Sequence, residues 1–98
     1  MFNEQKLFSL GQIVVTPNAF TAFEKTNSSF AHYLKRHLSG DWGDLCDEDK
    51  KENEESLKTG ARIFSSYFLP DETKIWIITD AEYENRREVT TILLPEDY

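Results

Sequence analysis

The sequence contains a single cysteine, Cys46, among 98 residues. No intramolecular disulfide can form, and a zinc site would need His32, His37 and carboxylates to converge on Cys46, although these residues show no spacing typical of ligands. We therefore expect a structural thiol in a reducing compartment, with neither a metal nor another cofactor.

Long hydrophobic runs are also missing. No stretch approaches the roughly 20 apolar residues that a membrane-spanning helix needs. Residues 1–6 lack the charged and apolar regions of a signal peptide. The sequence therefore predicts a cytoplasmic protein that does not bind a membrane.

Positive charge is scarce, because 11 Lys and Arg face 18 Asp and Glu, which gives a formal net charge of −7. Residues 1–40 carry four basic and two acidic side chains (+2), residues 41–60 three and eight (−5), and residues 61–98 four and eight (−4). Direct nucleic-acid binding depends on Lys and Arg neutralising phosphates, so we do not expect it. The charge fits a basic protein partner or simple solubility.

The pattern of hydrophobic residues predicts one domain over residues 1–98 with fold class α+β. Strands are expected over 6–15, 62–69, 74–79 and 88–94, and helices over 17–25, 30–38 and 47–59. Apolar residues on both sides of 74–79 indicate a central strand. We expect an antiparallel sheet of about four strands, joined by the first strand, with about three helices packed mainly on one face.

The helical and strand-rich halves meet at an unusual loop, Gly40-Asp41-Trp42-Gly43-Asp44-Leu45. Two glycines permit positive φ angles or close backbone approach. A large aromatic side chain is not needed to form such a turn. One interpretation is that Trp42 folds inward and anchors the loop; the other is that it stands outward as the anchor of a binding surface.

Polar residues after the loop extend it into a candidate binding patch. In the helix over 47–59, Asp49 and Asn53 lie between Leu45 and Leu57, where a buried polar group would need a partner. Arg62 follows closely enough to reach back to an acid on this helix. As structure, the patch is held by a salt bridge and caps; as function, it recognises a basic or aromatic group. Its predicted binding residues are Trp42, Asp44, Asn53, Asp49 and Arg62.

Acidic side chains are densest from Asp41 to Asp49. Their spacing does not match the calcium-binding loop with a glutamate at its twelfth position, so a solvated, capping role is favoured. No nucleophile and base pair stands out, and there is no phosphate-binding glycine loop. We therefore predict no catalytic residue and no metal site.

Three segments carry a resemblance to a known family. They are Gly40-Asp41-Trp42-Gly43-Asp44-Leu45, Lys74-Ile75-Trp76-Ile77-Ile78-Thr79, and the final Thr90-Thr91-Ile92-Leu93-Leu94-Pro95-Glu96-Asp97-Tyr98. Over nearly the whole chain from about Gly11, the sequence resembles a family of short uncharacterised bacterial proteins often labelled plasmid-related. The resemblance implies bacterial origin and a mobile-element setting, and it assigns no activity and no site residue.

The leading hypothesis is a small acidic, non-enzymatic protein-interaction domain that uses the Gly40–Leu45 loop and the acidic helix. It depends on an exposed Trp42. One alternative is a small hydrolase or metal-dependent enzyme at the Asp41–Asp49 acid cluster, which needs a pocket of convergent polar groups. The other is an inhibitor that mimics nucleic acid and blocks a DNA-binding enzyme. The sequence leaves the oligomeric state and the partner open.

Overall fold

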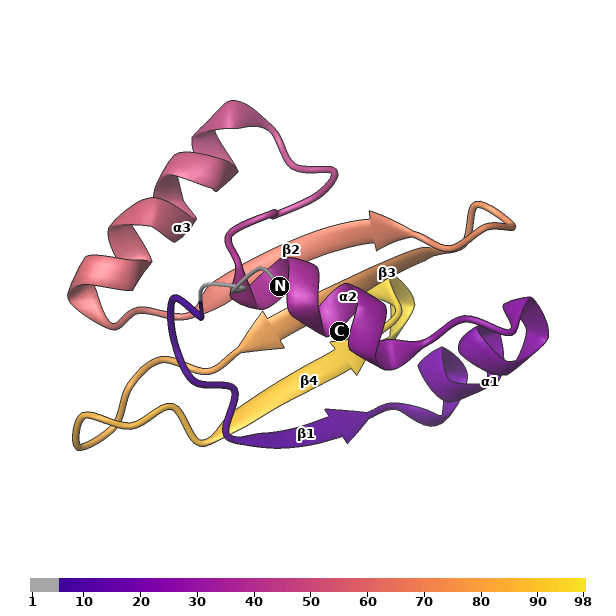
Figure 1. Ribbon diagram of the computed structural model, residues 1–98, viewed down its shortest axis with the longest axis horizontal. Coiled ribbons are helices and arrows are strands. Elements are labelled where there is room, and N and C mark those ends of the chain that lie inside the picture. The colour runs from indigo at the N-terminus through magenta and orange to yellow at the C-terminus, as the bar shows by residue number, and fades with distance from the viewer. Residues whose placement is uncertain (1–5) are drawn as a thin grey trace, which may run out of the picture.

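The structure is a computed structural model that describes residues 6–98 (Figure 1). It folds into helices and strands that follow one another in this order: β1 (Gln12–Val15), α1 (Pro17–Thr26), α2 (Phe30–Leu38), α3 (Asp47–Thr59), β2 (Ile63–Phe68), β3 (Lys74–Thr79), β4 (Val89–Leu93) and a 3₁₀ turn, η1 (Pro95–Asp97). Across these residues, no helix combines the length and apolar character needed to cross a membrane.

The strands form one sheet in the order β1-β4-β3-β2. The prediction of an α+β fold is confirmed, and β3 lies in the interior of the sheet between β2 and β4. Both pairs formed by β3 are antiparallel, whereas β1 runs parallel to β4. Because α1 to α3 and two strands separate β1 from β4, no hairpin turn imposes an antiparallel arrangement on this pair.

The first strand is shorter than predicted, starting at Gln12 rather than at residue 6. Gly11 has φ 65°, and an added Cβ there would lie 2.4 Å from the carbonyl oxygen of Glu88, so the chain touches the residue just before β4 at this point. Residues 6–10 cross the helix-covered side of the sheet instead. Leu7 N donates a hydrogen bond to the carbonyl of Leu38 (3.0 Å), and Thr90 Oγ1 donates one to the carbonyl of Leu10 (2.7 Å).

Local capping explains where α1 begins and ends. Thr16 Oγ1 accepts a hydrogen bond from Ala19 N (3.2 Å), and Pro17 occupies the first helical position, where its missing N–H costs nothing. Asn27 ends the helix in the left-handed conformation, with φ 52°. This turn directs the chain into α2.

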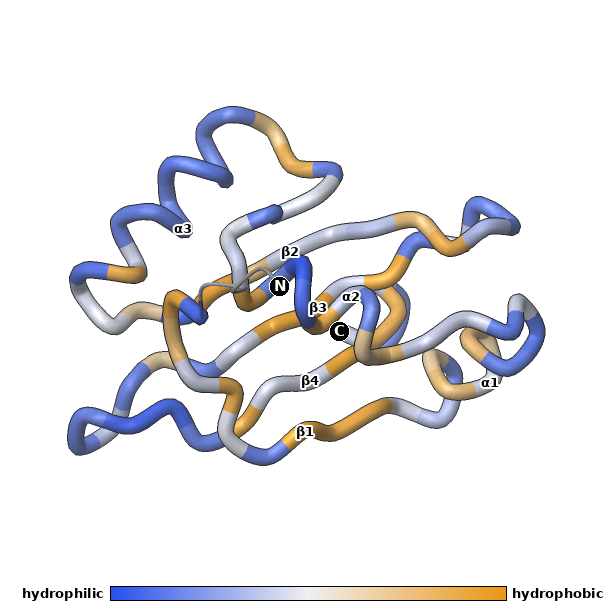
Figure 2. The backbone as a smooth tube through the Cα atoms, viewed as in Figure 1, coloured by the Kyte–Doolittle hydropathy of each residue, from blue (hydrophilic) through white to orange (hydrophobic). Residues whose placement is uncertain are grey.

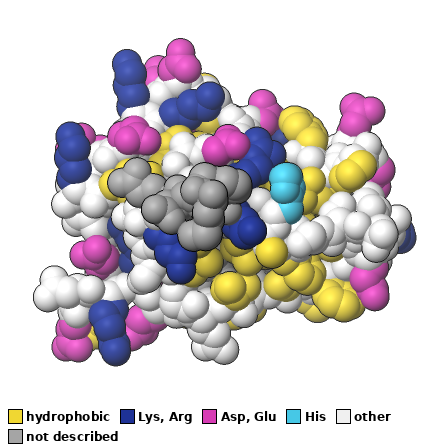
Figure 3. All heavy atoms as spheres, in the orientation of Figure 1, with side chains coloured by type: hydrophobic (Ala, Val, Ile, Leu, Met, Phe, Trp, Pro, Cys, Tyr) yellow, Lys and Arg dark blue, Asp and Glu magenta, His cyan; other side chains and the backbone are white. Residues whose placement is uncertain are grey.

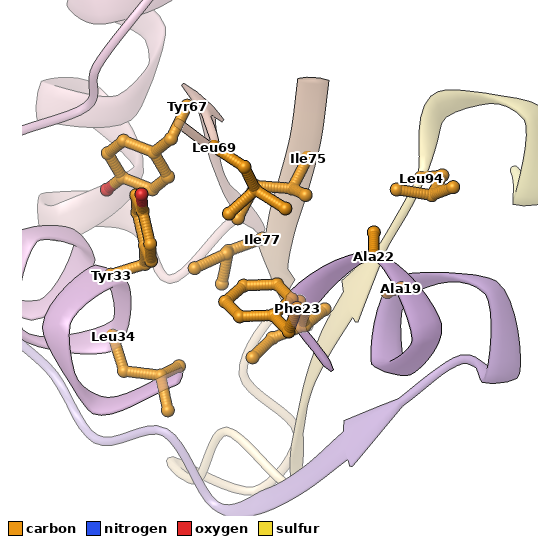
Figure 4. Close-up of a cluster of buried hydrophobic side chains, with 11 residues drawn as sticks. Ala19, Ala22, Phe23, Tyr33, Leu34, Tyr67, Leu69, Ile75, Ile77 and Leu94 are labelled. Carbon is orange, nitrogen blue, oxygen red and sulfur yellow. The ribbon is translucent and has the colours of Figure 1, made fainter. Parts of the chain in front are cut away.

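The hydrophobic core lies between one face of the sheet and the helices α1 and α2 (Figures 1 and 4). Phe23 and Tyr33 meet edge to face, with ring centroids 5.7 Å apart. The core residues are Ala19, Ala22, Phe23, Tyr33, Leu34, Tyr67, Leu69, Ile75, Ile77, Ile92 and Leu94. Their burial sets the positions of α1 and α2 relative to the sheet.

Helix α3 lies along β2, at the far side of the sheet from β1 (Figure 1). Only Asn53 and Ser56 are buried among its residues, and Figure 2 colours most of the helix as hydrophilic. Gly60, at φ 83°, ends the helix and lets the chain enter β2. The most acidic segment is therefore held at one edge of the fold.

Candidate functional site: a guarded edge and an open edge of the sheet

Trp42 is buried, with 4% of its surface exposed. Its indole Nε1 donates a hydrogen bond to Glu54 Oε2 (2.9 Å), and its ring lies 6.4 Å from that of Phe8. The structure therefore selects the inward alternative for Trp42. The exposed aromatic anchor on which the leading hypothesis depended is not present, because α3 and the segment 6–10 enclose the ring.

The backbone of the Gly40–Leu45 loop pairs with the outer edge of β2. Ser66 N donates to the carbonyl of Trp42 (3.1 Å), and Asp44 N donates to the carbonyl of Ser66 (2.6 Å). Between them Gly43 has φ 76°, and an added Cβ would lie 2.0 Å from the carbonyl oxygen of Ser66. Only glycine fits this approach, so the loop works as a short extra strand that covers β2.

Asn53 covers the next position on the same edge. Its Nδ2 donates to the carbonyl of Phe64 (2.6 Å) and its Oδ1 accepts from Phe64 N (3.0 Å), while the side chain is 3% exposed. Tyr33 OH donates to the carbonyl of Phe68 (3.3 Å) at the end of the strand. We call this side of β2, from Phe64 to Phe68, the guarded edge.

The other predicted patch residues separate into two places. Asp44 is exposed and its carboxylate lies 3.3 Å from Lys74 Nζ, a surface ion pair of little energetic weight. Asp49, Asn53 and Arg62 line one small hollow of about 270 Å³. Trp42 and Asp44 are not part of its lining.

Arg62 does not form the predicted salt bridge to an acid of α3. Its Nη1 donates to Tyr98 OH (2.8 Å), and the guanidinium lies 5.7 Å from the centre of the Tyr98 ring. Tyr98 also meets Trp76, with ring centroids 5.8 Å apart. Arg62 thus ties the C-terminus to the sheet, since the aromatic ring and hydroxyl offer it two favourable contacts.

The acids from Asp41 to Asp49 do not gather around a common point. Asp41 accepts a hydrogen bond from Arg36 Nε (2.6 Å), and this bond holds the pKa of Asp41 below its ordinary value. Asp47 and Asp49 lie in the exposed first turn of α3. Within residues 6–98, no three His, Cys, Asp or Glu side chains converge closely enough to hold a metal ion.

A buried polar chain crosses the helix-covered face, and sequence analysis missed it. His37 is fully buried; its Nδ1 is hydrogen-bonded to Ser65 Oγ (2.5 Å) and its Nε2 to Thr79 Oγ1 (2.9 Å). Thr79 Oγ1 is bonded in turn to Thr90 Oγ1 (2.7 Å). The three hydroxyl residues occupy same-face positions on β2, β3 and β4, which is the signal that could have revealed them.

The charge of His37 is strongly disfavoured in this position. Burial, together with the positive charge of Arg87, lowers the pKa of His37 to about 3. His37 is therefore neutral at physiological pH, and both ring nitrogens are occupied by hydroxyl partners. This arrangement suits a structural connector between α2 and the sheet rather than a solvent-accessible general base.

The outer side of β1 is built differently, and we call it the open edge. The amide of Gln12 donates to Glu88, just before β4, and that of Thr16 donates to Ile92 in β4. By strand alternation, the backbone groups of Ile13 and Val15 therefore point away from the sheet. No strand from the described part of the chain pairs with this side. The side chains of Ile13 and Val14 are 44% and 42% exposed.

The surroundings of the open edge are apolar. Residues 11–16 contain no charged side chain, and Phe20 at the start of α1 is 48% exposed. Figure 2 colours most of β1 as hydrophobic. Figure 3 shows hydrophobic side chains gathered around β1 and between β1 and α2. The two edges of the sheet thus differ in both pairing and polarity.

Comparisons with known proteins give no relative: no family model, curated protein or solved structure matches the chain. The resemblance to plasmid-related bacterial proteins stays a prediction.

We expect the burial of His37 to make stability depend on pH. Its pKa is about 3 in the folded chain and 6.5 in an unfolded one, so below pH 6.5 only the unfolded state takes up this proton. The free energy of unfolding should therefore fall by about 1.4 kcal/mol per pH unit from pH 6 to pH 4 on account of His37. Urea unfolding at several pH values should show that the free energy of unfolding of His37→Asn falls less from pH 6 to pH 4 than that of the wild-type chain.

The exposed His32 provides the matched control. His32→Asn should keep the wild-type pH dependence. Parallel pH profiles for His37→Asn and the wild-type chain would contradict the assignment.

We expect Asn53 to matter because it satisfies two backbone groups at once. Asn53→Ala should lower the free energy of unfolding by about 2 to 4 kcal/mol, since the N–H and C=O of Phe64 lose their partner. Asn53→Asp should also be destabilised, because a carboxylate cannot donate to the carbonyl. Chemical denaturation measures both changes.

Asn18 is the comparison residue, because it is exposed and its amide donates to Asp97 (2.8 Å). Asn18→Ala should cost less than about 1 kcal/mol. If both alanine variants were equally stable, the guarded edge would not depend on Asn53.

Proposed function

We propose that this chain is a protein-interaction domain, and that its binding surface is the open edge rather than the Gly40–Leu45 loop. The observation that carries the proposal is the contrast between the two edges of one sheet. Three separate segments cover the backbone of β2, whereas the backbone groups of Ile13 and Val15 face outward.

Unpaired sheet edges attract other strands, and soluble proteins usually protect them with charges, prolines, bulges or covering segments. The open edge has no charge from Gly11 to Thr16, and Pro17 lies beyond the strand in α1. An added extended segment could form hydrogen bonds with the main chain of Ile13 and Val15. The short length of β1 limits the interaction to a few residues.

Side chains beside the open edge supply the apolar contact that main-chain pairing alone lacks. Ile13 points to the helix-covered side and Val14 to the opposite side, because their β4 partners Thr90 and Thr91 do so. Both are more than two-fifths exposed, as is Phe20. A partner strand would therefore bury apolar surface on both faces of the sheet.

The hypotheses of a hydrolase and of a nucleic-acid mimic stay predictions. Asp41 and Asp44 are paired with Arg36 and Lys74 at the surface. The remaining acids of residues 41–60 lie on α3, where a basic partner could reach them. One of them, Glu54, accepts the indole N–H of Trp42 and so belongs to the cover of β2.

We expect Val14→Lys to abolish partner binding without unfolding the chain. A lysine at this exposed position would place an unpaired charge in the new strand pair. Affinity capture with the tagged full chain, from a bacterial lysate that also contains the untagged chain, should show a captured protein, either another protein or the untagged chain itself, that the variant loses. Quantitative mass spectrometry reads the capture. Circular dichroism should be unchanged.

Phe68→Lys is the matched control, because Phe68 is 49% exposed at the guarded edge. It should capture the same protein as the wild-type chain. The proposal would be contradicted if Val14→Lys captured the same proteins as the wild-type chain, so that no complex of the wild-type chain depended on β1.

A further inference from the structure

We propose that the open edge is occupied by a second copy of this chain, with the two β1 strands antiparallel about a two-fold axis at Val14. This inference rests on the proposed function, because it requires the open edge to be a binding surface. It adds the identity of the partner and the register of the strands. The product is a dimer with one continuous eight-stranded sheet, twice the four strands of a single chain.

Backbone geometry selects this register. Ile13 and Val15 are the residues of β1 whose N–H and C=O groups point outward. When Ile13 pairs with Val15 of the partner subunit, the N–H of each residue donates to the C=O of the other. The two-fold axis repeats this pair. All outward backbone groups of Ile13 and Val15 are then satisfied in both copies. Gly11 and Pro17 bound the ladder, since neither residue belongs to β1.

The side chains are self-complementary in the same register. Val14 lies directly opposite Val14 of the partner subunit, in a pair without direct backbone hydrogen bonds, where side chains are closest. On the helix-covered side, Ile13 lies opposite Val15 of the partner subunit. Cross-strand pairs of β-branched residues are favourable, and the exposed surfaces of Ile13 and Val14 become buried.

The distribution of charge favours a second copy despite the net charge of −7. The segment that would cross the dyad, residues 11–16, is uncharged. Helix α3, with its six acids, contacts β2, which is the strand farthest from β1 in the sheet. Three strand spacings of about 4.8 Å separate β1 from β2. The two acidic helices therefore lie at opposite ends of the dimer, where their repulsion is weakest.

Disulfide trapping tests the register. The exposed Cys46 is first replaced, giving Cys46→Ser as the background. In that background, Val14→Cys places two cysteines opposite each other, whereas Ile13→Cys places each cysteine opposite a valine. In a glutathione redox buffer, Val14→Cys should form a covalent dimer at least about tenfold faster than Ile13→Cys, because the Cβ atoms must lie close.

Sedimentation equilibrium tests the assembly. The wild-type full chain should have the mass of two 11.4 kDa chains, about 23 kDa, and should dissociate on dilution. Val14→Lys should be monomeric with an unchanged circular dichroism spectrum. Phe68→Lys should remain a dimer, because Phe68 lies at the guarded edge.

A monomeric wild-type chain at all concentrations, with equal trapping rates for the two cysteine variants, would overturn the inference. If that monomer still captured a protein that Val14→Lys loses, the proposed function would stand with a different partner. If it captured no such protein, the proposed function would fail as well.

Discussion

The fold depends on how its sheet handles unpaired backbone groups. A four-stranded open sheet has two outer strands, and each presents a row of N–H and C=O groups that costs free energy if buried without partners. Along β2, the backbone of Trp42 and Asp44 and the amide of Asn53 satisfy both outward groups of Ser66 and Phe64, and the hydroxyl of Tyr33 donates to the carbonyl of Phe68. The unusual loop and the acidic helix α3 are therefore explained first as parts of this cover.

The interior contains a second polar arrangement that complements the first. His37 on α2 is hydrogen-bonded to hydroxyl groups of Ser65 and Thr79, and the chain of bonds continues through Thr90 to the carbonyl of Leu10. A buried polar group without partners would be costly, so the network fixes α2, the sheet and the segment 6–10 in one arrangement. Trp42 and Phe8 pack around the imidazole and exclude water from it.

Sequence alone predicted the elements whose signals are local. The helices over 30–38 and 47–59 and the strand over 74–79 have the observed bounds, because caps, turns and periodicity lie within each segment. The first strand was predicted too long, since its start is set by the contact of Gly11 with Glu88, which lies far along the chain. The parallel pairing of β1 with β4 is likewise a property of the whole sheet.

The candidate site was harder to predict for the same reason. The position of Trp42 depends on Glu54 and Phe8, and the difference between the edges emerges only after the strand order is known. Asn53 could be singled out because a polar residue on the inner side of a helix needs a partner. That partner, the backbone of Phe64, lies on another element, and the pattern could not identify it.

The most direct test of the account is amide hydrogen exchange, resolved by residue with NMR, at several protein concentrations. The account predicts strong protection of Phe64 and Ser66 at every concentration, because their amides donate to Asn53 and Trp42. It also predicts rapid exchange of Ile13 and Val15 in dilute protein and slower exchange as the concentration rises. Rapid exchange at Phe64 and Ser66, or concentration-independent protection of Ile13 and Val15, would contradict it.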